Sequence, residues 1–252
     1  MSPDLLTVAV LFVAGFGAGV INSIAGGGSL FTLPLLIFLG LPPTVANGTN
    51  RIAVLSGTLG ASTTFHRRGL VPGAWLRLAL PPALAGVVLG TWAAVVVGDL
   101  AFQRILAVVL VLVAAWTVWK PTRAPQEGNP EPPGGRRAWL VRGAFFAVGL
   151  YGGFIQAGVG FIVLAITSAN GLDLLRGNAM KAPLVCFFTL VALVLFALSG
   201  VVSWLMGISL ASGQILGAVA GVRLQVLKGQ AWVRNVLTAV IVIFAIRLLL
   251  MT

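Results

Sequence analysis

Charged side chains are scarce in this chain, and acidic ones are the scarcest. Only 8% of the 252 residues are charged, whereas an ordinary soluble domain has about a quarter. The sequence contains five Asp and Glu residues, one His and one Cys. A single cysteine excludes an internal disulfide, and one histidine leaves no Cys/His cluster for a metal. Because the sequence also lacks a P-loop and a G-x-S-x-G motif, we predict no enzyme activity, no ATP-driven transport, no cofactor and no bound metal.

Apolar side chains, by contrast, make up 59% of the chain. Four stretches have no charged residue at all: 5–50, 78–98, 143–172 and 182–222. Each can cross a hydrocarbon core of about 30 Å as a helix that rises about 1.5 Å per residue. A soluble fold of this size has too little interior to bury so much apolar surface. The sequence therefore predicts an all-α polytopic integral membrane protein embedded in a lipid bilayer.

The excess of basic residues also fits a membrane protein. The formal net charge is +11, and most of the sixteen Lys and Arg residues fall in 66–77, 120–142, 176–181 and 222–234. This is the positive-inside pattern of loops between membrane segments, so we predict no nucleic-acid binding. Hydropathy, read together with Gly, Pro and charge, predicts segments near 5–25, 29–39, 44–65, 72–97, 101–119, 139–157, 160–170, 174–199, 203–221 and 233–250.

The chain divides into two similar halves. Residues 121–137 are rich in Pro, Gly and polar side chains, and we predict a flexible linker between a first membrane repeat, 1–120, and a second, 138–252. When the sequence is shifted by about 130 residues, glycine and polar positions match in order. The matches include Asn22 with Gln156, Asn47 with Asn178, and Gly15, Gly19 and Gly26 with Gly149, Gly153 and Gly160.

The basic loops decide the relative orientation of the halves. If each half crosses the membrane an odd number of times, all four basic regions lie on one side, as the positive-inside rule requires. We therefore predict two inverted-topology repeats, with both termini outside and the linker in the cytoplasm. Such repeats are a hallmark of secondary transporters, whose halves move about a site near the midplane. Whether the short segments at 29–39 and 160–170 cross fully or re-enter stays open.

A run of glycines interrupts the first apolar stretch. Residues 22–29 read NSIAGGGS, and the segment that follows is long enough for only half of the bilayer. The second half has a similar interruption between Gly152 and Gly160. An interrupted, half-membrane helix can direct its N-terminal amides into the membrane interior, where they favour an anion. The alternative is that the glycines only allow close helix packing.

A fixed positive charge beside amide and hydroxyl groups occurs once in each half. The first half has Asn47-Gly48-Thr49-Asn50-Arg51, and the second half has Gly177-Asn178-Ala179-Met180-Lys181. A lone cation in a bilayer is costly, so it usually faces a partner or a water-filled path. Carboxylates are too few to supply that partner, which suggests that the partner is an anionic substrate. The alternative is that Arg51 and Lys181 snorkel to opposite membrane interfaces.

These motifs together resemble those of a known family. The chain resembles the sulfite exporter TauE/SafE family in both halves. In the first half the resemblance lies between Gly15 and Arg51, in NSIAGGGS, GLPP and ANGTNR; in the second half it lies in GGFIQAGVGF and GNAMKA. The resemblance covers nearly the whole chain apart from the linker. It implies a bacterial inner-membrane permease whose members are linked to export of sulfite or small organosulfonates.

The leading hypothesis is a secondary transporter that exports a small anion, sulfite or an organosulfonate, by alternating access. A passive anion channel, a non-transporting membrane subunit and, least favoured, an integral-membrane enzyme are the alternatives, and a homodimer is possible. The expected site contains Arg51 and Lys181 as charge partners of the anion. Side-chain hydrogen bonds would come from Asn22, Thr49, Asn50, Gln156 and Asn178, and backbone amides from Gly26, Gly27, Gly28, Gly158 and Gly160.

Overall fold

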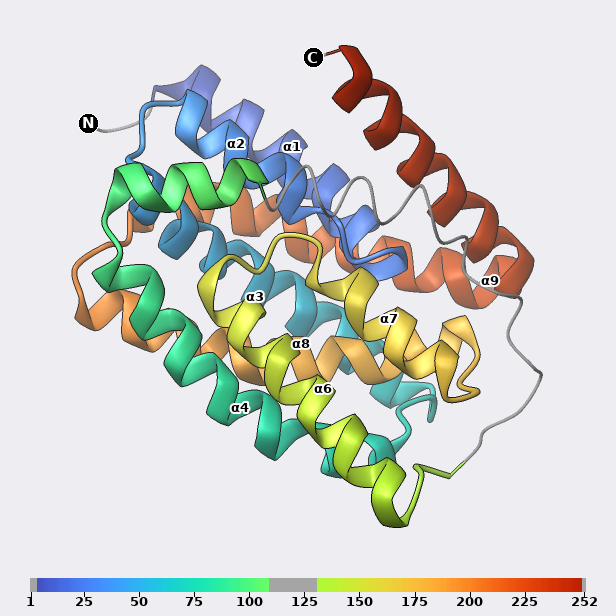
Figure 1. Cartoon of the computed structure of the whole chain (residues 1–252). Helices are drawn as coiled ribbons and strands as arrows, with labels where there is room; N and C mark the ends of the chain where they lie inside the picture. The colour runs from blue at the N-terminus through green and yellow to red at the C-terminus, as the bar shows by residue number, and fades with distance from the viewer. Residues whose placement is uncertain (1–3, 109–130, 251–252) are drawn as a thin grey trace.

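A computed structural model describes residues 4–108 and 131–250 (Figure 1). Within these ranges every regular element is a helix, which confirms the predicted all-α class. The helices are α1 (Leu5–Ile24), α2 (Ser29–Phe38), α3 (Pro43–Arg67), α4 (Gly73–Val96), α6 (Gly135–Phe154), α7 (Val159–Ala169), α8 (Leu174–Leu198) and α9 (Trp204–Leu250). Residues 99–108 are also helical.

Four of these helices are long and apolar enough to cross a membrane. They are α1, α4, α8 and the first 25 residues of α9. Their outward faces carry large apolar side chains, among them Trp92 and Leu198, which are 65% and 81% exposed. Such faces are unfavourable in water but are the normal surface of a protein in lipid. By contrast, α2 and α7 have only ten and eleven residues.

The predicted segments agree with the helices to within a few residues, with two exceptions. The segments predicted at 203–221 and 233–250 belong to one helix, α9, which changes direction along its length (Figure 1). The intervening basic sequence contains no proline and one glycine, and basic side chains are good helix formers, so nothing there ends the helix. In addition, α6 begins at Gly135, before the predicted start. Most of the predicted segment 101–119 and most of the linker lie outside the described residues.

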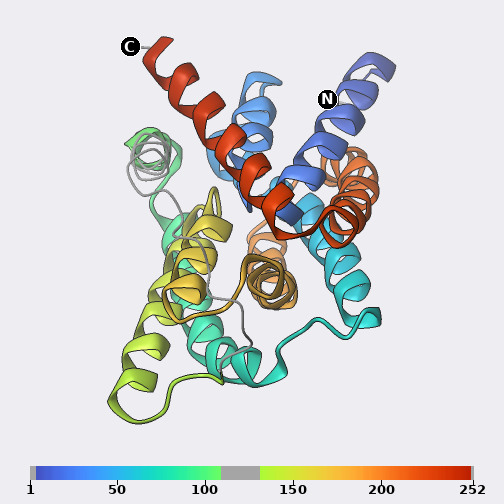
Figure 2. The same ribbon diagram turned by 90° about the vertical axis from the view of Figure 1, so that its right-hand side faces the viewer.

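Glycines bring two pairs of helices into close contact. On α1, a Cβ at Gly19 would overlap the backbone of Gln214 on α9; on α6, a Cβ at Gly149 would overlap the backbone of Ala83 on α4. Successive contacts advance in the same sense on both helices of each pair, so α1 is parallel to α9 and α4 is parallel to α6. Figure 1 shows α4 and α6 running opposite to α1, and Figure 2 shows the two pairs on opposite sides of the molecule.

The centre of the fold is formed by α3 and α8, which contact each other and the two outer pairs. These two helices carry most of the buried polar side chains that the sequence singles out. Asn47, Thr49, Asn50, Arg51, Asn178 and Lys181 are all at most 4% exposed. The predicted site residues on α3 and α8 are therefore enclosed by protein.

Candidate functional site at two helix breaks

Two breaks in the helical backbone meet near the centre of the molecule. The first break, residues 25–28, separates α1 from α2, and the second, residues 155–158, separates α6 from α7. Gly26 has a φ of 87° in the first break, and Gln156 has a φ of 65° in the second. The two breaks touch, since a Cβ on Gly26 would overlap the Cα of Gly160. The N-termini of α2 and α7 consequently lie beside each other. The amides at a helix N-terminus favour a negative charge nearby.

Arg51 of α3 fastens the second break. One terminal nitrogen, Nη1, donates to the carbonyl oxygen of Gly152 at 2.6 Å and to Oε1 of Gln156 at 2.8 Å. The other, Nη2, donates to the carbonyl oxygen of Gly153 at 2.8 Å and more weakly to Oδ1 of Asn47 at 3.4 Å. The guanidinium also lies 5.3 Å from the ring centre of Phe196. The cation thereby satisfies carbonyls at the C-terminal end of α6, where the helix dipole is negative.

Lys181 of α8 fastens the first break in the same way. Its Nζ donates to the carbonyl oxygen of Asn22 at 2.9 Å, to that of Ser23 at 3.4 Å, and to Oδ1 of Asn178. Asn178 in turn donates to the carbonyl oxygen of Ile24 at 2.8 Å. In the first half, Asn47 makes the matching bond to the carbonyl oxygen of Phe154 at 2.8 Å. Both cations are buried and bond to backbone carbonyls, which argues against the alternative that they snorkel to membrane interfaces.

The helix ends give a different pairing of the two breaks from the one that the sequence suggests. Ile24 and Phe154 are the last residues of α1 and α6, so Asn22 has Gly152 as its counterpart, and Gln156 has Gly26. The predicted match of Asn22 with Gln156 is wrong by four residues. That distance is about one helical turn.

The other predicted hydrogen-bonding residues fall into two groups. Asn22 and Asn50 belong to the first break: Oδ1 of Asn22 accepts from the amide of Gly28 at 2.7 Å, and Oδ1 of Asn50 accepts from Thr32 at 2.7 Å. Thr49 lies elsewhere, since its hydroxyl oxygen accepts from the amide of Ser203 ahead of α9. The glycines are closely packed as well; a Cβ on Gly27, for example, would lie 2.7 Å from the ring of Phe161.

Three buried N–H donors of the site have no hydrogen-bond partner among residues 4–108 and 131–250: Nδ2 of Asn22, Nδ2 of Asn50 and Nε of Arg51. A buried donor without an acceptor is unfavourable, and it marks a place where a further acceptor would bind well. No carboxylate in the described ranges pairs with Arg51 or Lys181; the ion pair found there, between Arg176 and Asp173, lies at the start of α8. The centre therefore holds two positive charges together with unused donors.

Several residues at the breaks were missed by the sequence analysis. Thr189 accepts a hydrogen bond from Nε2 of Gln156, Oε1 of Gln225 accepts one from Asn178, and Thr91 donates to the carbonyl oxygen of Gly153 at 3.3 Å. Thr91 and Thr189 are uncharged polar residues within long apolar runs, which was the one available signal, whereas Gln225 lies between Arg223 and Lys228 and had no such signal. That signal does not say which break the residue will face.

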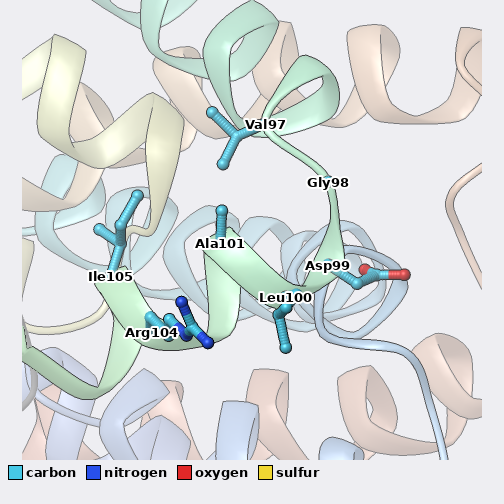
Figure 3. Close-up of a pocket in the computed structure, with 7 residues that line it drawn as sticks. All are labelled: Val97, Gly98, Asp99, Leu100, Ala101, Arg104 and Ile105. Atoms are coloured by element: carbon cyan, nitrogen blue, oxygen red, sulfur yellow. The ribbon is translucent and has the colours of Figure 1, made fainter.

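A depression in the described residues is lined by residues outside both breaks. It is formed by residues 97–105, at the turn that follows α4 (Figure 3). None of its lining residues is a predicted site residue. Asp99, on its edge, has another role, because Oδ1 accepts from the amide of Thr44 at 2.9 Å and caps the start of α3.

The sequence agrees with one family over almost its full length. The family model described as sulfite exporter TauE/SafE matches residues 11–248. The chain belongs to this family. It is 34% identical over 247 residues to the probable membrane transporter protein ORF9 of a Sinorhizobium species, covering 96% of this chain and 92% of the relative. It is 31% identical over 250 residues to the probable membrane transporter protein YfcA of Escherichia coli K12, covering 99% and 91%.

A third relative, a probable membrane transporter protein of Haemophilus influenzae, is 31% identical over 234 residues, covering 92% of this chain and 89% of the relative. No solved structure matches the chain significantly. The TauE/SafE family and these relatives are membrane transporters and not enzymes. The chain is accordingly a multi-pass membrane protein of a transporter family, and the predicted absence of enzyme activity agrees with this.

Proposed function

We propose that this TauE/SafE protein is a secondary transporter that exports a small anion, sulfite or an organosulfonate, by alternating access. The observation that carries the proposal is the pair of buried cations, Arg51 and Lys181, without a carboxylate partner, next to the opposed N-termini of α2 and α7. Buried charge of one sign is unfavourable unless a counter-ion compensates it. A transported anion would supply that compensation.

Two inverted repeats would explain the arrangement of helices. The proposed counterparts, α1 and α6, run in opposite senses (Figure 1). The halves have matching helix lengths, with 20, 10 and 25 residues in α1 to α3 and 20, 11 and 25 in α6 to α8. Positive φ values recur at Gly40 and Gly171 and at Gly69 and Gly200. We take α2 and α7, about 15–17 Å long at 1.5 Å per residue, as the half-membrane helices.

The predicted site residues would have different roles in binding the anion. Arg51 and Lys181 supply positive potential, Asn22 and Asn50 offer their unpartnered N–H groups, and Gln156 and Asn178 hold the cations in place. Backbone amides of Gly27, Gly158 and Gly160 would complete the cradle, whereas the amides of Gly26 and Gly28 already donate to the carbonyl oxygen of Ile21 and to Oδ1 of Asn22. Thr49 contributes by fixing the start of α9.

The enclosure of the site favours a transporter over a passive channel. The side chains on α3 and α8 that would surround the anion are at most 4% exposed. An open channel needs a continuous watery path past such groups, whereas alternating access requires a state closed to both sides. We assign residues 1–120 and 138–252 to the two moving halves, with residues 121–137 and the basic loops in the cytoplasm and a homodimer as a possible assembly.

Membrane potential is the simplest energy source for export. No Asp or Glu lies within any labelled helix, so a protein carboxylate that carries a proton across is absent from these spans. A negative interior drives an anion outward by about 2.3 kcal/mol per charge per 100 mV. Export should therefore follow an imposed potential without a coupled cation.

Binding of anions to the purified protein tests this proposal. Thermal unfolding would be followed in detergent with sulfite, thiosulfate, sulfoacetate, taurine and a carboxylate control. A ligand at a hundred times its Kd stabilises the folded state by about 2.7 kcal/mol, which gives a measurable rise in Tm. Selective stabilisation by a sulfur oxyanion or a sulfonate supports the proposal, whereas an equal response to all anions or to none contradicts it.

A further inference from the structure

The two buried cations lie at positions that are not equivalent in the two halves. Asn47 and Asn178 each follow the first residue of their helix, Pro43 or Leu174, by four positions. Arg51 comes four residues after Asn47, but Lys181 comes three residues after Asn178. Residues three and four apart lie on the same helix face, so either spacing places the cation beside the asparagine.

From these different positions the cations reach equivalent acceptors. The first helix is α1 in the first half and α6 in the second. Each cation binds the first helix of the other half, at the carbonyl oxygens of the two residues that precede its last residue. Arg51 binds Gly152 and Gly153, and Lys181 binds Asn22 and Ser23. The last residue of each of those helices is bound by the asparagine that accompanies the cation. The same three-carbonyl pattern is thus built twice with different side chains.

Helices that end inside a membrane make such a device necessary. The last four carbonyls of a helix have no partner within the helix, and in lipid there is no water to bind them. Neighbouring residues of the chain satisfy some of these groups, but the carbonyls of the last three residues here are bound by side chains from the opposite half. A cation suits this place because the helix dipole is negative there.

We propose that Asn47 with Arg51, and Asn178 with Lys181, are reciprocal clamps by which each half of the chain positions the helix break of the other half. These four are positioning residues. Both Nη atoms of Arg51 and the Nζ of Lys181 already donate to protein acceptors. The cations therefore act on the site through the placement of the breaks and through their charge. The inference rests on the proposed function only in assigning anion binding to these breaks.

Hydrogen exchange measured by mass spectrometry on the full chain, without any anion, tests the clamps directly. Arg51→Ala should accelerate exchange of residues 155–161 about tenfold or more, because the carbonyls of α6 lose their partners, and should leave residues 25–31 unchanged. Lys181→Ala should do the reverse. Asn47→Ala and Asn178→Ala, which keep the cations, should give the same crossed pattern with smaller amplitude. Arg77→Ala on α4, outside both clamps, is the control.

Acceleration confined to the mutated helix, or equal acceleration of both breaks, would overturn the proposal. The asparagine variants keep the test decisive if a cation variant does not fold. Since no anion is present, the result is independent of the transport proposal. A protein that shows the crossed pattern but binds no anion would retain the clamps and lose the proposed function.

Moving a cation provides a second test. In the second half, Lys181→Asn combined with Ala182→Arg recreates the Asn50-Arg51 order of the first half. Ala182 packs in a cluster with Phe65, as Arg51 lies over Phe196. If the cation stabilises the first break by binding the carbonyls of α1, this double variant should recover most of the exchange protection of residues 25–31 that Lys181→Ala loses. It should also recover most of the loss in Tm. No recovery beyond Lys181→Ala, in a double variant that elutes as a monodisperse folded protein, contradicts the clamp.

Discussion

The two helix breaks each have a left-handed residue two positions after the preceding helix ends, but they differ in their residues and in the backbone further on, where Gly28 has a φ of −59° and Gly158 a φ of 74°. At the left-handed position the first break has Gly26, with φ 87°, and the second has Gln156, with φ 65°. Glycine adopts this conformation without strain, whereas an L side chain there costs about 1–2 kcal/mol. In return, Gln156 is held between Arg51 and Thr189. The comparison teaches that both breaks place a left-handed residue at this position, and that in the second break the side chain of that residue forms hydrogen bonds as well.

The largest expected effect comes from filling the contact between the breaks. Gly26→Ala combines a left-handed alanine with an overlap against Gly160, so it should lower the free energy of unfolding by about 2–5 kcal/mol. Gly160→Ala has the overlap without the strained φ and should cost less. Thermal unfolding in detergent measures both. Gly17→Ala, whose Cβ meets nothing within 4 Å, should be nearly neutral; equal losses in all three variants would refute the close contact.

Removing the side-chain anchor of the second break should have the next largest effect. Gln156→Ala loses the bonds to Arg51 and Thr189 and keeps the strained φ, so we expect a loss of about 2–3 kcal/mol. Gln156→Gly loses the same bonds but relieves the strain, and it should be about 1 kcal/mol more stable than the alanine variant. The reverse order in a thermal-unfolding comparison would mean that Gln156 is not strained.

The two clamp asparagines should differ in a defined direction. Asn178 bonds to Ile24, Lys181 and Gln225, whereas Asn47 has a strong bond to Phe154 and a weak one from Arg51. Each alanine variant leaves a buried carbonyl unpaired, at about 1–3 kcal/mol, and Asn178→Ala should be the more destabilised. Exposed Gln103→Ala serves as control. A larger loss for Asn47→Ala would contradict this ranking.

The smallest effects should appear at the starts of α3 and α8. Asp173 accepts from the amide of Arg176 and caps α8 directly, whereas α3 begins after Pro42 and is capped by Asp99 from after α4. Asp173→Ala and Asp99→Ala should each cost about 1 kcal/mol. Glu131→Ala, in an exposed position, should cost nothing measurable. If only Asp173→Ala lowers Tm, the capping of α3 by Asp99 is unimportant.

The sequence predicts the helices well because membrane segments leave strong local signals. Apolar length, glycine and proline locate α1 to α4, α7 and α8 to within a few residues. The register of the repeat was harder, because Gly15 and Gly19, and Gly149 and Gly153, recur every four residues. A pattern that repeats once per helical turn matches equally well when shifted by one turn, which explains the error at Asn22 and Gln156.

The clamps could not be predicted from the sequence for a different reason. Arg51 and Gly152 are 101 residues apart, and Lys181 and Asn22 are 159 apart. The acceptors are backbone carbonyls, which every residue possesses, so no side chain marks them. The sequence shows that each cation needs a partner, but only the fold shows that the partner is the end of a helix from the other half.

Flux through proteoliposomes tests the central claim most directly. Vesicles loaded with radiolabelled sulfite or with a labelled organosulfonate would be held at zero potential or at 100 mV, interior negative. Efflux would be compared with that from protein-free vesicles and from vesicles loaded with a labelled carboxylate. The account predicts saturable, protein-dependent efflux of sulfite that the negative interior accelerates, with little efflux of the carboxylate. Efflux no faster than from protein-free vesicles at either potential, for sulfite and for an organosulfonate alike, would contradict it.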